Sequence, residues 1–329
     1  MSSIVTSTDP NLETCTSTDP NLETCTMTVG SWSVSYYQFK SDLYALTTQS
    51  NVNKKSDLTG LRAWNTGIIR LASWLLGRRE VVAGRSAVEL GCGVGVLGLL
   101  LGGELCAGKV VCTDGRKDVI DIAKMNLRGE CNVRAEIMSW EDVEARGRVG
   151  KGDVVVGCEL LYYETDVKVL VECIESVLEV RDVASQISGG GSVEGIPLLA
   201  PPMAVLCHNI RRFEIPAEFV EHCGNNGLKA YAIMGRAEIY DKNSANEEEG
   251  EGGDLDFDYY GQAKLWCVVR NEDEGDFLKF IEKSKRGKGE GKEMLLELER
   301  WVDEVWDKEC GGGENIEDAL PAWVGEEED

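Results

Sequence analysis

An apolar strand that breaks into a glycine-rich turn constrains this chain more than any other feature. Residues 88–98 read VELGCGVGVLG, and the next apolar strand ends in the sequence CTDG, which contains Asp114. A strand, a glycine turn and a helix in this order form a pocket for a nucleotide cofactor, because the turn lets the ligand approach the backbone and the helix N-terminus presents free N–H groups. The sequence therefore predicts an α/β domain built around such a pocket.

Two kinds of cofactor fit this glycine pattern. Residues 93–98 satisfy the G-x-G-x-x-G pattern of dinucleotide sites, whereas the E-x-G-x-G-x-G spacing of S-adenosylmethionine (AdoMet) sites is given by Glu89, Gly91, Gly93 and Gly95. A carboxylate at the first position would repel the two phosphates of NAD but could accept a hydrogen bond from the ammonium group of AdoMet. The aspartate that ends the second strand could bind the ribose hydroxyls of either cofactor. AdoMet is therefore favoured, and NAD stays open as an alternative.

Apolar segments alternate with helical patterns after the glycine turn. Such alternation favours parallel strands joined by helical crossovers, and the acidic connection before the last strand favours a final antiparallel hairpin. We expect a Rossmann-like α/β fold with a seven-stranded, mostly parallel sheet. The expected strands are 87–90, 110–113, 133–138, 154–158, 203–208, 228–234 and 264–269, and the expected helices are 96–106, 117–128, 165–180 and 216–223.

The ends of the chain differ in composition from its middle. The decapeptide TSTDPNLETC occurs twice in succession near the N-terminus, and its polar residues have no periodicity that could build a core. Residues 31–40 favour a strand or hairpin, residues 58–76 favour a helix that covers the sheet, and EMLLELERWVDEVW near the C-terminus has the apolar face of a helix. We therefore divide the chain into a disordered repeat at 1–27, an AdoMet-binding domain at 28–270 with an acidic loop insert at 241–262, and an acidic helical extension at 271–329.

Charge and cysteine usage narrow the possible partners. The chain has 58 acidic and 34 basic residues, and residues 241–329 alone hold 28 acidic and 11 basic ones. Such a field repels nucleic acid and attracts a lysine-rich protein segment, although a charge run also serves solubility. The twelve cysteines include no C-x-x-C pair, so we expect no metal site and reduced thiols. With no secretory signal and no membrane span apparent, we expect a monomer in the cytoplasm or nucleus.

A second cluster of chemically capable residues follows the fourth expected strand. The segment GDVVVGCELLYY places Glu159 and Tyr162 immediately after the strand, with Cys158 as its last residue. Because the carboxyl ends of parallel strands face the ligand cleft, these side chains would lie beside the cofactor. Trp140, after the third expected strand, would lie near the adenine. Each of these residues could instead have a purely structural role, in the core or in a loop.

Taken in order along the chain, several motifs resemble methyltransferase family 16, whose seven-stranded AdoMet-dependent enzymes mostly methylate protein lysines. The motifs are TGLRAW, VELGCGVGVLG, VCTDG, SW at 139–140 and VVVGCELLYY. The resemblance implies the class I AdoMet-dependent methyltransferase fold. It also implies that the D-x-x-Y motif of the family corresponds to Glu159 and Tyr162, where the carboxylate is kept on a longer side chain. The cofactor contacts that it implies are Trp64, Gly91, Gly93, Asp114, Trp140 and Cys158.

The implied reaction is methyl transfer from AdoMet to a lysine side chain of a protein substrate. Lysine must be neutral to attack the methyl group, and both desolvation and a neighbouring sulfonium cation would lower its pKa. Glu159 would then orient the amine, and Tyr162 would close the slot around it. A minority branch that methylates histidine also resembles the E-x-x-Y pattern, so histidine stays open as the target. A non-catalytic AdoMet-binding scaffold is the third alternative.

Overall fold

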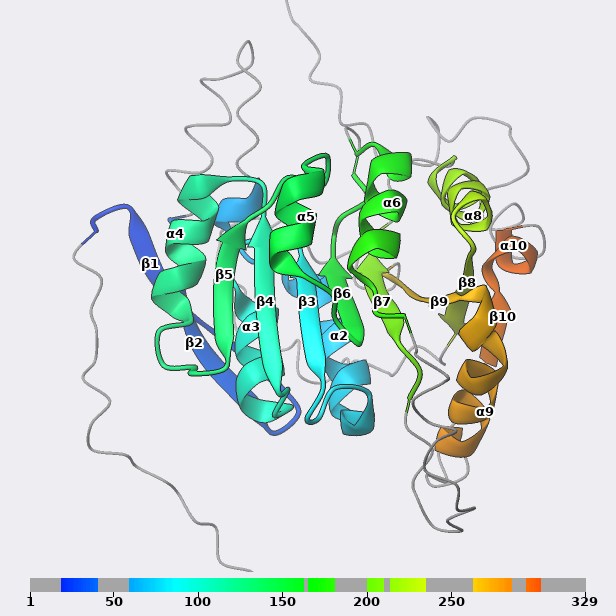
Figure 1. The fold of residues 1–329 in the computed structure, drawn as a ribbon. Helices are drawn as coiled ribbons and strands as arrows, with labels where there is room; N and C mark the ends of the chain where they lie inside the picture. Colours follow the sequence, from blue (N-terminus) through cyan, green and yellow to red (C-terminus); the bar gives the residue numbers. More distant parts are fainter. Residues whose placement is uncertain are drawn as a thin grey trace, which may run out of the picture.

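A single eight-stranded sheet with helices on both faces forms the body of the protein (Figure 1). The computed structural model describes residues 19–40, 59–162, 165–180, 200–209, 214–234, 263–285 and 294–302. A separate two-stranded hairpin packs against helix α4 at one end of the sheet. None of the helices within these ranges combines the length and apolar character that a membrane crossing requires.

The sheet is parallel in its middle and antiparallel at one edge. Its strand order is β10-β8-β9-β7-β6-β3-β4-β5, and β9 runs antiparallel to both of its neighbours. The first strand of this sheet is β3, and β4 and β5 follow on one side of it. The next strand, β6, pairs with β3 on its other side. This reversal of strand order opens a cleft at the carboxyl ends of these strands. This topology confirms the predicted fold class. The strands are β3 (Ser86–Leu90), β4 (Lys109–Asp114), β5 (Val133–Ile137), β6 (Val154–Cys158), β7 (Met203–His208), β8 (Leu228–Met234), β9 (Lys264–Arg270) and β10 (Met294–Glu297).

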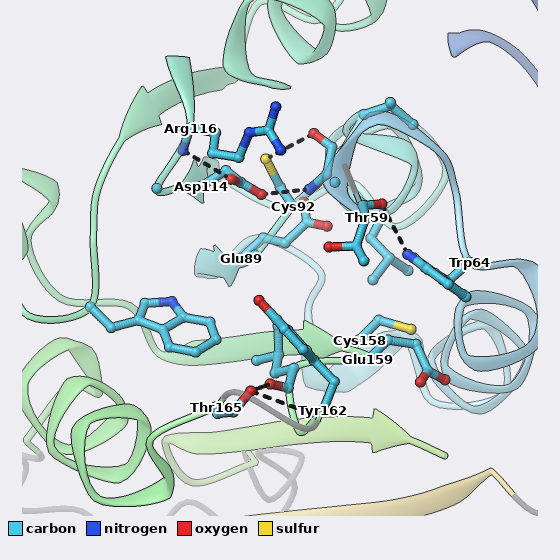
Figure 2. A pocket seen from close by; sticks show the side chains of 18 of the residues that line it. Thr59, Trp64, Glu89, Cys92, Asp114, Arg116, Cys158, Glu159, Tyr162 and Thr165 are labelled. Atoms are coloured by element: carbon cyan, nitrogen blue, oxygen red, sulfur yellow. Dashed lines mark hydrogen bonds between the residues drawn. The ribbon is translucent and has the colours of Figure 1, made fainter. Parts of the chain in front are cut away.

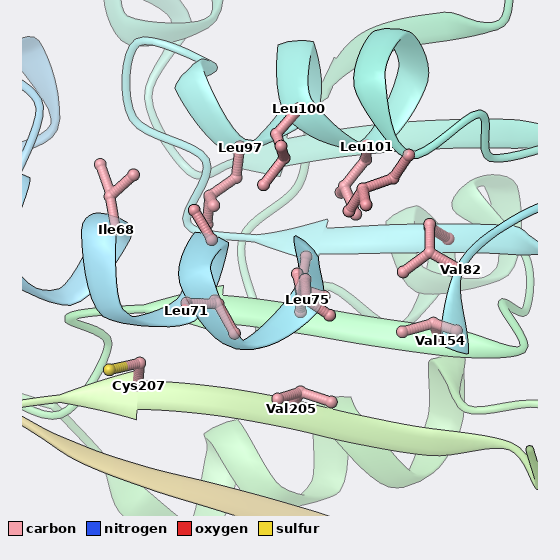
Figure 3. Packing of buried hydrophobic residues seen from close by; sticks show 14 of the residues in the cluster. Ile68, Leu71, Leu75, Val82, Leu97, Leu100, Leu101, Val154, Val205 and Cys207 are labelled. Atoms are coloured by element: carbon pink, nitrogen blue, oxygen red, sulfur yellow. The ribbon is translucent and has the colours of Figure 1, made fainter. Parts of the chain in front are cut away.

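Two hydrophobic layers fix the helices to the sheet. Ile68, Leu71 and Leu75 recur at helical spacing, and Figure 3 shows Leu71 and Leu75 packed over Val154 and Val205 of the sheet. One face is covered by α2 (Asn65–Leu76), α3 (Val96–Leu99), α4 (Lys117–Asn126) and α9 (Glu274–Lys285). The other face is covered by α5 (Val143–Val149), α6 (Val167–Val177), α8 (Ile215–Asn225) and α10 (Leu298–Trp301).

The N-terminal hairpin begins earlier than the sequence predicted. Residues 22–27, expected to be disordered, belong to β1 (Leu22–Val29), which pairs antiparallel with β2 (Trp32–Phe39). The alternation that stabilises β1 comes from Met27 and Val29, which are buried, and Gly30 turns the chain with φ +59°. Residues 19–21 of the predicted disordered segment form the turn before β1, whereas residues 1–18 and the acidic insert 241–262 lie outside the described residues.

The C-terminal segment also differs from its prediction. The segment EMLLELERW was expected to form a helix, but Met294–Glu297 form β10, which pairs with β8 in the same sheet. Leucines are compatible with either a helix or a strand. The open edge of β8 favours a strand here, because it offers unpaired backbone groups. Residues 271–285 and 294–302 therefore continue the domain, with Phe277 of α9 and Leu298 of α10 fully buried.

Two helices differ from the sequence prediction in smaller ways. The helix expected at 96–106 is an α-helix only as far as Leu99, and residues Leu100–Glu104 form a π-helical turn. The sequence missed α5, which is only seven residues long and buries only Ala145 and Val149. Its start is fixed by Asp142, whose Oδ1 accepts a hydrogen bond of 2.9 Å from the Ala145 N–H.

One asparagine joins the hairpin to the body of the protein. Asn126 Oδ1 accepts a 2.7 Å hydrogen bond from the Tyr37 N–H, and its Nδ2 donates to Tyr37 O at 2.9 Å. The same Nδ2 also donates to Val94 O, in the glycine-rich turn, at 2.8 Å. Asn126 thus connects β2, the end of α4 and the turn after β3.

We predict that Asn126→Ala destabilises the protein through the loss of these three hydrogen bonds. Each such bond contributes about 0.5–1.5 kcal/mol, so the free energy of unfolding should fall by about 2–3 kcal/mol in urea titration. The matched control is Asn226→Ala, since Asn226 Nδ2 donates a single bond to His222 O at the end of α8. Equal losses in the two variants would contradict this role of Asn126.

Candidate active site

A cavity of about 430 Å³ opens at the carboxyl ends of β3, β4, β5 and β6 (Figure 2). It lies where the strand order predicted a cleft. The structure brings nearly all of the predicted site residues to its walls: Trp64, Glu89, Gly91, Gly93, Asp114, Trp140, Cys158, Glu159 and Tyr162. The exception is Gly95, which does not line the cavity but precedes α3 with φ +86°.

The glycine turn is shaped by left-handed backbone conformations. Gly91 and Gly93 have φ values of +59° and +51°, which disfavour any residue with a side chain. A Cβ atom on Gly91 would also lie 2.6 Å from Leu160 Cδ2. The turn is tied to the next strand by the Cys92 N–H, which donates to Thr113 O at 2.8 Å. The backbone of the turn can therefore lie against a ligand in the cavity.

Glu89, the last residue but one of β3, is a buried carboxyl group. Its side chain is only 2% exposed, and Oε2 is fully enclosed without a hydrogen bond of ordinary geometry among the described residues, although the Cys112 thiol and the Gly98 N–H lie close to the carboxyl group. Burial raises the pKa of Glu89 to about 8, and the nearby charge of Asp114 acts in the same direction. An enclosed acceptor in a cofactor cavity fits a ligand that carries an ammonium group, as AdoMet does, and fits a pyrophosphate poorly.

Asp114 is held at the cavity wall by backbone donors. Its Oδ2 accepts from the Gly93 N–H at 3.2 Å, and its Oδ1 accepts from the Arg116 N–H at 3.1 Å. These bonds fix the carboxylate at the end of β4, and each carboxylate oxygen can accept more than one hydrogen bond. The position suits a ribose whose hydroxyls donate to the carboxylate, as the sequence predicted.

Two tryptophans from separate segments of the chain border the cavity. Trp64 lies immediately before α2, and its Nε1–H donates to Thr59 O at 3.0 Å, which fixes the indole across the TGLRAW segment. Trp140 follows β5 and approaches the glycine turn, since a Cβ on Gly91 would lie 3.7 Å from its Cζ2. Arg146 Nε donates to Trp140 O at 2.6 Å and so orders this loop. Both rings are placed to contact a bound cofactor.

The end of β6 carries the two residues with catalytic potential. Glu159 has φ +54°, a strained value for a non-glycine residue, and such strain is often found at functional sites. The Tyr162 N–H donates to Thr165 Oγ1 at 3.2 Å, and Thr165 Oγ1 donates to Leu160 O at 2.7 Å. Figure 2 shows the Tyr162 ring reaching into the cavity, while the Glu159 carboxylate lies on the side of helix α2.

The cysteines at the cavity are thiols rather than nucleophiles. Burial raises the pKa of both Cys92 and Cys158 well above its ordinary value, and neighbouring carboxylates act in the same direction. His208, the last residue of β7, lies among apolar residues on the face of the sheet opposite α2, with its ring 4.8 Å from that of Trp266. Burial lowers the pKa of His208 to about 3, so it is neutral.

Sequence reasoning missed three residues that shape the end of β6. Asn209 donates to Glu159 Oε1 through Nδ2 at 2.9 Å, Gly67 lies against Cys158 and Glu159, and Thr165 fixes the turn before α6. Their contacts reach across separate elements, and no local pattern marks them. The conformation of the Glu159 backbone was equally invisible, because the sequence there is neither glycine nor asparagine.

Comparison with known proteins agrees with this geometry. The pattern of a family described as lysine methyltransferase matches residues 46–187. A calmodulin-lysine N-methyltransferase from Arabidopsis thaliana is 25% identical over 130 residues, which cover 36% of this chain and 43% of the relative. A protein-lysine N-methyltransferase EFM3 from Chaetomium thermophilum is 26% identical over 200 residues, which cover 56% of this chain and 53% of the relative. The chain thus spans about half the length of these relatives.

Among solved structures, a putative methyltransferase from Streptococcus mutans is similar to this chain. The TM-score is 0.46 at 10% identity, with 75% of this chain and 55% of the other covered. The fold assignment rests on the strand order described above. The resemblance to methyltransferase family 16 is confirmed by the family match, and AdoMet is confirmed as the cofactor that this family and this cavity indicate.

We predict that Glu89→Gln stabilises the ligand-free protein increasingly as the pH rises. The pKa of Glu89 is raised from 4.5 to about 8 on folding, so between these values the unfolded state loses a proton that the folded state keeps. Wild-type stability should therefore fall relative to the variant by about 1.4 kcal/mol for each pH unit in this window. Urea unfolding at pH 5.5, 7 and 8.5 measures the difference, and a difference independent of pH would contradict the assignment.

Proposed function

We propose that this protein transfers a methyl group from AdoMet to the side chain of a lysine in a protein substrate. The observation that carries the proposal is that Glu159 and Tyr162 line the same cavity as the AdoMet cradle of Gly91, Gly93 and Asp114. The names of the two curated relatives support a protein lysine as the acceptor. A cytoplasmic or nuclear location is part of the same proposal and rests on the cysteine pattern.

Each residue of the cradle, together with Glu89 and the two tryptophans, would contact a different part of AdoMet. Glu89 accepts from the ammonium group, Asp114 accepts from ribose hydroxyls, and the glycine turn brings backbone N–H groups close to the carboxylate. Trp64 and Trp140 contact the remaining apolar surface. When bound here, AdoMet supplies a methyl group on a positively charged sulfur. An ammonium group beside Glu89 would favour the ionised carboxylate and offset the cost of burying its charge.

The end of β6 acts on the acceptor amine. An ammonium ion has no lone pair, so the lysine must lose its proton, and entry into a cavity walled by Tyr162 and Trp140 favours the neutral form. Glu159 orients the amine through a hydrogen bond, and the Tyr162 ring excludes water from one side. The proton leaves to solvent before the lysine is engaged, so this arrangement needs no strong base inside the cavity.

Methyl labelling tests the activity and identifies the target together. Purified protein, tritium-labelled AdoMet and a hypomethylated cell lysate should yield labelled lysine in a discrete protein, located by mass spectrometry, with recombinant calmodulin as a defined second acceptor. Glu159→Ala should lower the rate on the order of 100-fold through loss of orientation. The matched control is Glu172→Ala on the exposed side of α6, which should keep the wild-type rate.

The same labelling distinguishes the alternatives. If the labelled residue is methylhistidine, the acceptor is a histidine and the lysine in this proposal is wrong. If the wild-type protein binds AdoMet but labels nothing, and Glu159→Ala behaves in the same way, the proposed enzymatic activity is wrong. This result would favour a non-catalytic AdoMet-binding scaffold.

We predict that Asp114→Asn weakens AdoMet binding about 10- to 100-fold, because hydrogen bonds to a charged acceptor contribute about 1.5–3 kcal/mol. Isothermal titration calorimetry measures the dissociation constant. Asp121→Asn is the matched control, since Asp121 lies exposed on α4 and pairs with Lys117, and it should leave the constant unchanged. Tight binding of NAD by the wild type would contradict the choice of cofactor.

A further inference from the structure

The position of the Glu159 carboxylate is set by residues from two other elements. Glu159 follows the last paired residue of β6, and its own N–H continues the ladder by donating to Cys207 O at 2.8 Å. At this point the backbone turns left-handed, with φ +54°. The side chain therefore leaves the ladder on the side of α2, next to the end of β7 (Figure 2).

Asn209 meets this carboxylate with two donors. Its Nδ2 donates to Glu159 Oε1 at 2.9 Å, and its backbone N–H lies 3.3 Å from both Oε1 and Oε2. The amide is oriented with Nδ2 toward the carboxylate, and the backbone N–H, whose direction does not depend on the orientation of the amide, meets the same carboxylate. Both kinds of donor on this residue are thus directed at Glu159.

The other end of the Asn209 amide has no comparable role. Its Oδ1 is buried and has no donor among the described residues. An asparagine that served only to satisfy its surroundings would use its acceptor as well as its donor, as Asn126 does. The bonds of Asn209 to Glu159 are therefore the contacts that explain an amide at this place.

Gly67 supplies the opposite wall. It lies in the first turn of α2, and a Cβ at this position would be 2.7 Å from Glu159 Oε1 and 2.5 Å from Cys158 Sγ. Both distances are shorter than a Cβ contact tolerates, so a side chain at position 67 would push the carboxylate out of its present place. The side chain of a glutamate, one methylene longer than that of aspartate, reaches this space.

We propose, on the basis of the function proposed above, that Gly67 and Asn209 form a socket that positions the Glu159 carboxylate for methyl transfer. Neither residue needs to touch the substrate. Asn209 holds the carboxylate from β7, Gly67 leaves room for it beneath α2, and the left-handed backbone delivers it there. The acceptor amine then meets a carboxylate with one fixed orientation.

A double-mutant cycle tests the socket with Asn209→Ala, Glu159→Ala and the combination of both. The readouts are the rate of tritium transfer into lysate protein at saturating AdoMet, the KM for AdoMet, and the urea midpoint. Asn209→Ala should lower the rate on the order of 10-fold or more, with the KM for AdoMet changed by less than about 2-fold. In the Glu159→Ala background it should lower the rate no further, and its effect on the urea midpoint should shrink.

Matched variants separate the socket from general damage. Asn226→Ala and Gly147→Ala should keep the wild-type rate, since Asn226 bonds only within the end of α8 and a Cβ on Gly147 meets nothing within 4 Å. Gly67→Ala should lower the rate strongly. Adding Glu159→Asp to this variant should restore part of the rate, because the shorter carboxylate withdraws from the added methyl group.

The outcomes distinguish this inference from the function on which it rests. Additive effects of Asn209→Ala and Glu159→Ala on both rate and urea midpoint, with wild-type methyl transfer intact, would overturn the socket alone. A wild-type protein that binds AdoMet and labels no protein would overturn the proposed function, and with it the positioning role. Coupled effects in both measurements support the socket and its contribution to the reaction.

Discussion

The junction between β3 and β4 is the constraint on which the rest of the structure depends. Thr113 Oγ1 donates to Glu89 O at 2.7 Å, and the Cys92 N–H returns a bond to Thr113 O at 2.8 Å. These bonds hold the carboxyl ends of two central strands in one place while the chain between them turns through three glycines with positive φ. The cavity, the carboxylate of Asp114 and the start of α3 are all positioned by this junction.

The sequence predicted those parts of the fold in which local pattern and tertiary packing agree. The bounds of β6, β7 and β8 match the expected ranges, because each is a short, mostly apolar segment bounded by polar, glycine or proline residues. Most of the cavity was also foreseeable, since the motifs sit at strand ends and the topology brings strand ends together. β1 and β10 were not, because a threonine-rich strand and a leucine-rich strand acquire their conformation from the partner strand.

At the site, sequence-based prediction was limited in a different way. Glu159 and Tyr162 were recognised by spacing, but the direction of the Glu159 side chain depends on one backbone dihedral angle and on Asn209, fifty residues further along the chain. Glu89 presents the complementary case, in which a carboxyl group suited to a ligand is unfavourable without it. Burial of an acceptor without a partner lowers the stability of the free protein, a common compromise between stability and function.

The bonds of Asn126 also determine when the N-terminal hairpin can become ordered during synthesis. β1 and β2 leave the ribosome before Asn126, which holds Tyr37 and lies 89 residues later in the chain. A lone two-stranded hairpin is at best marginally stable in water. The hairpin must therefore wait for the cofactor-binding core, and its docking follows the formation of that core.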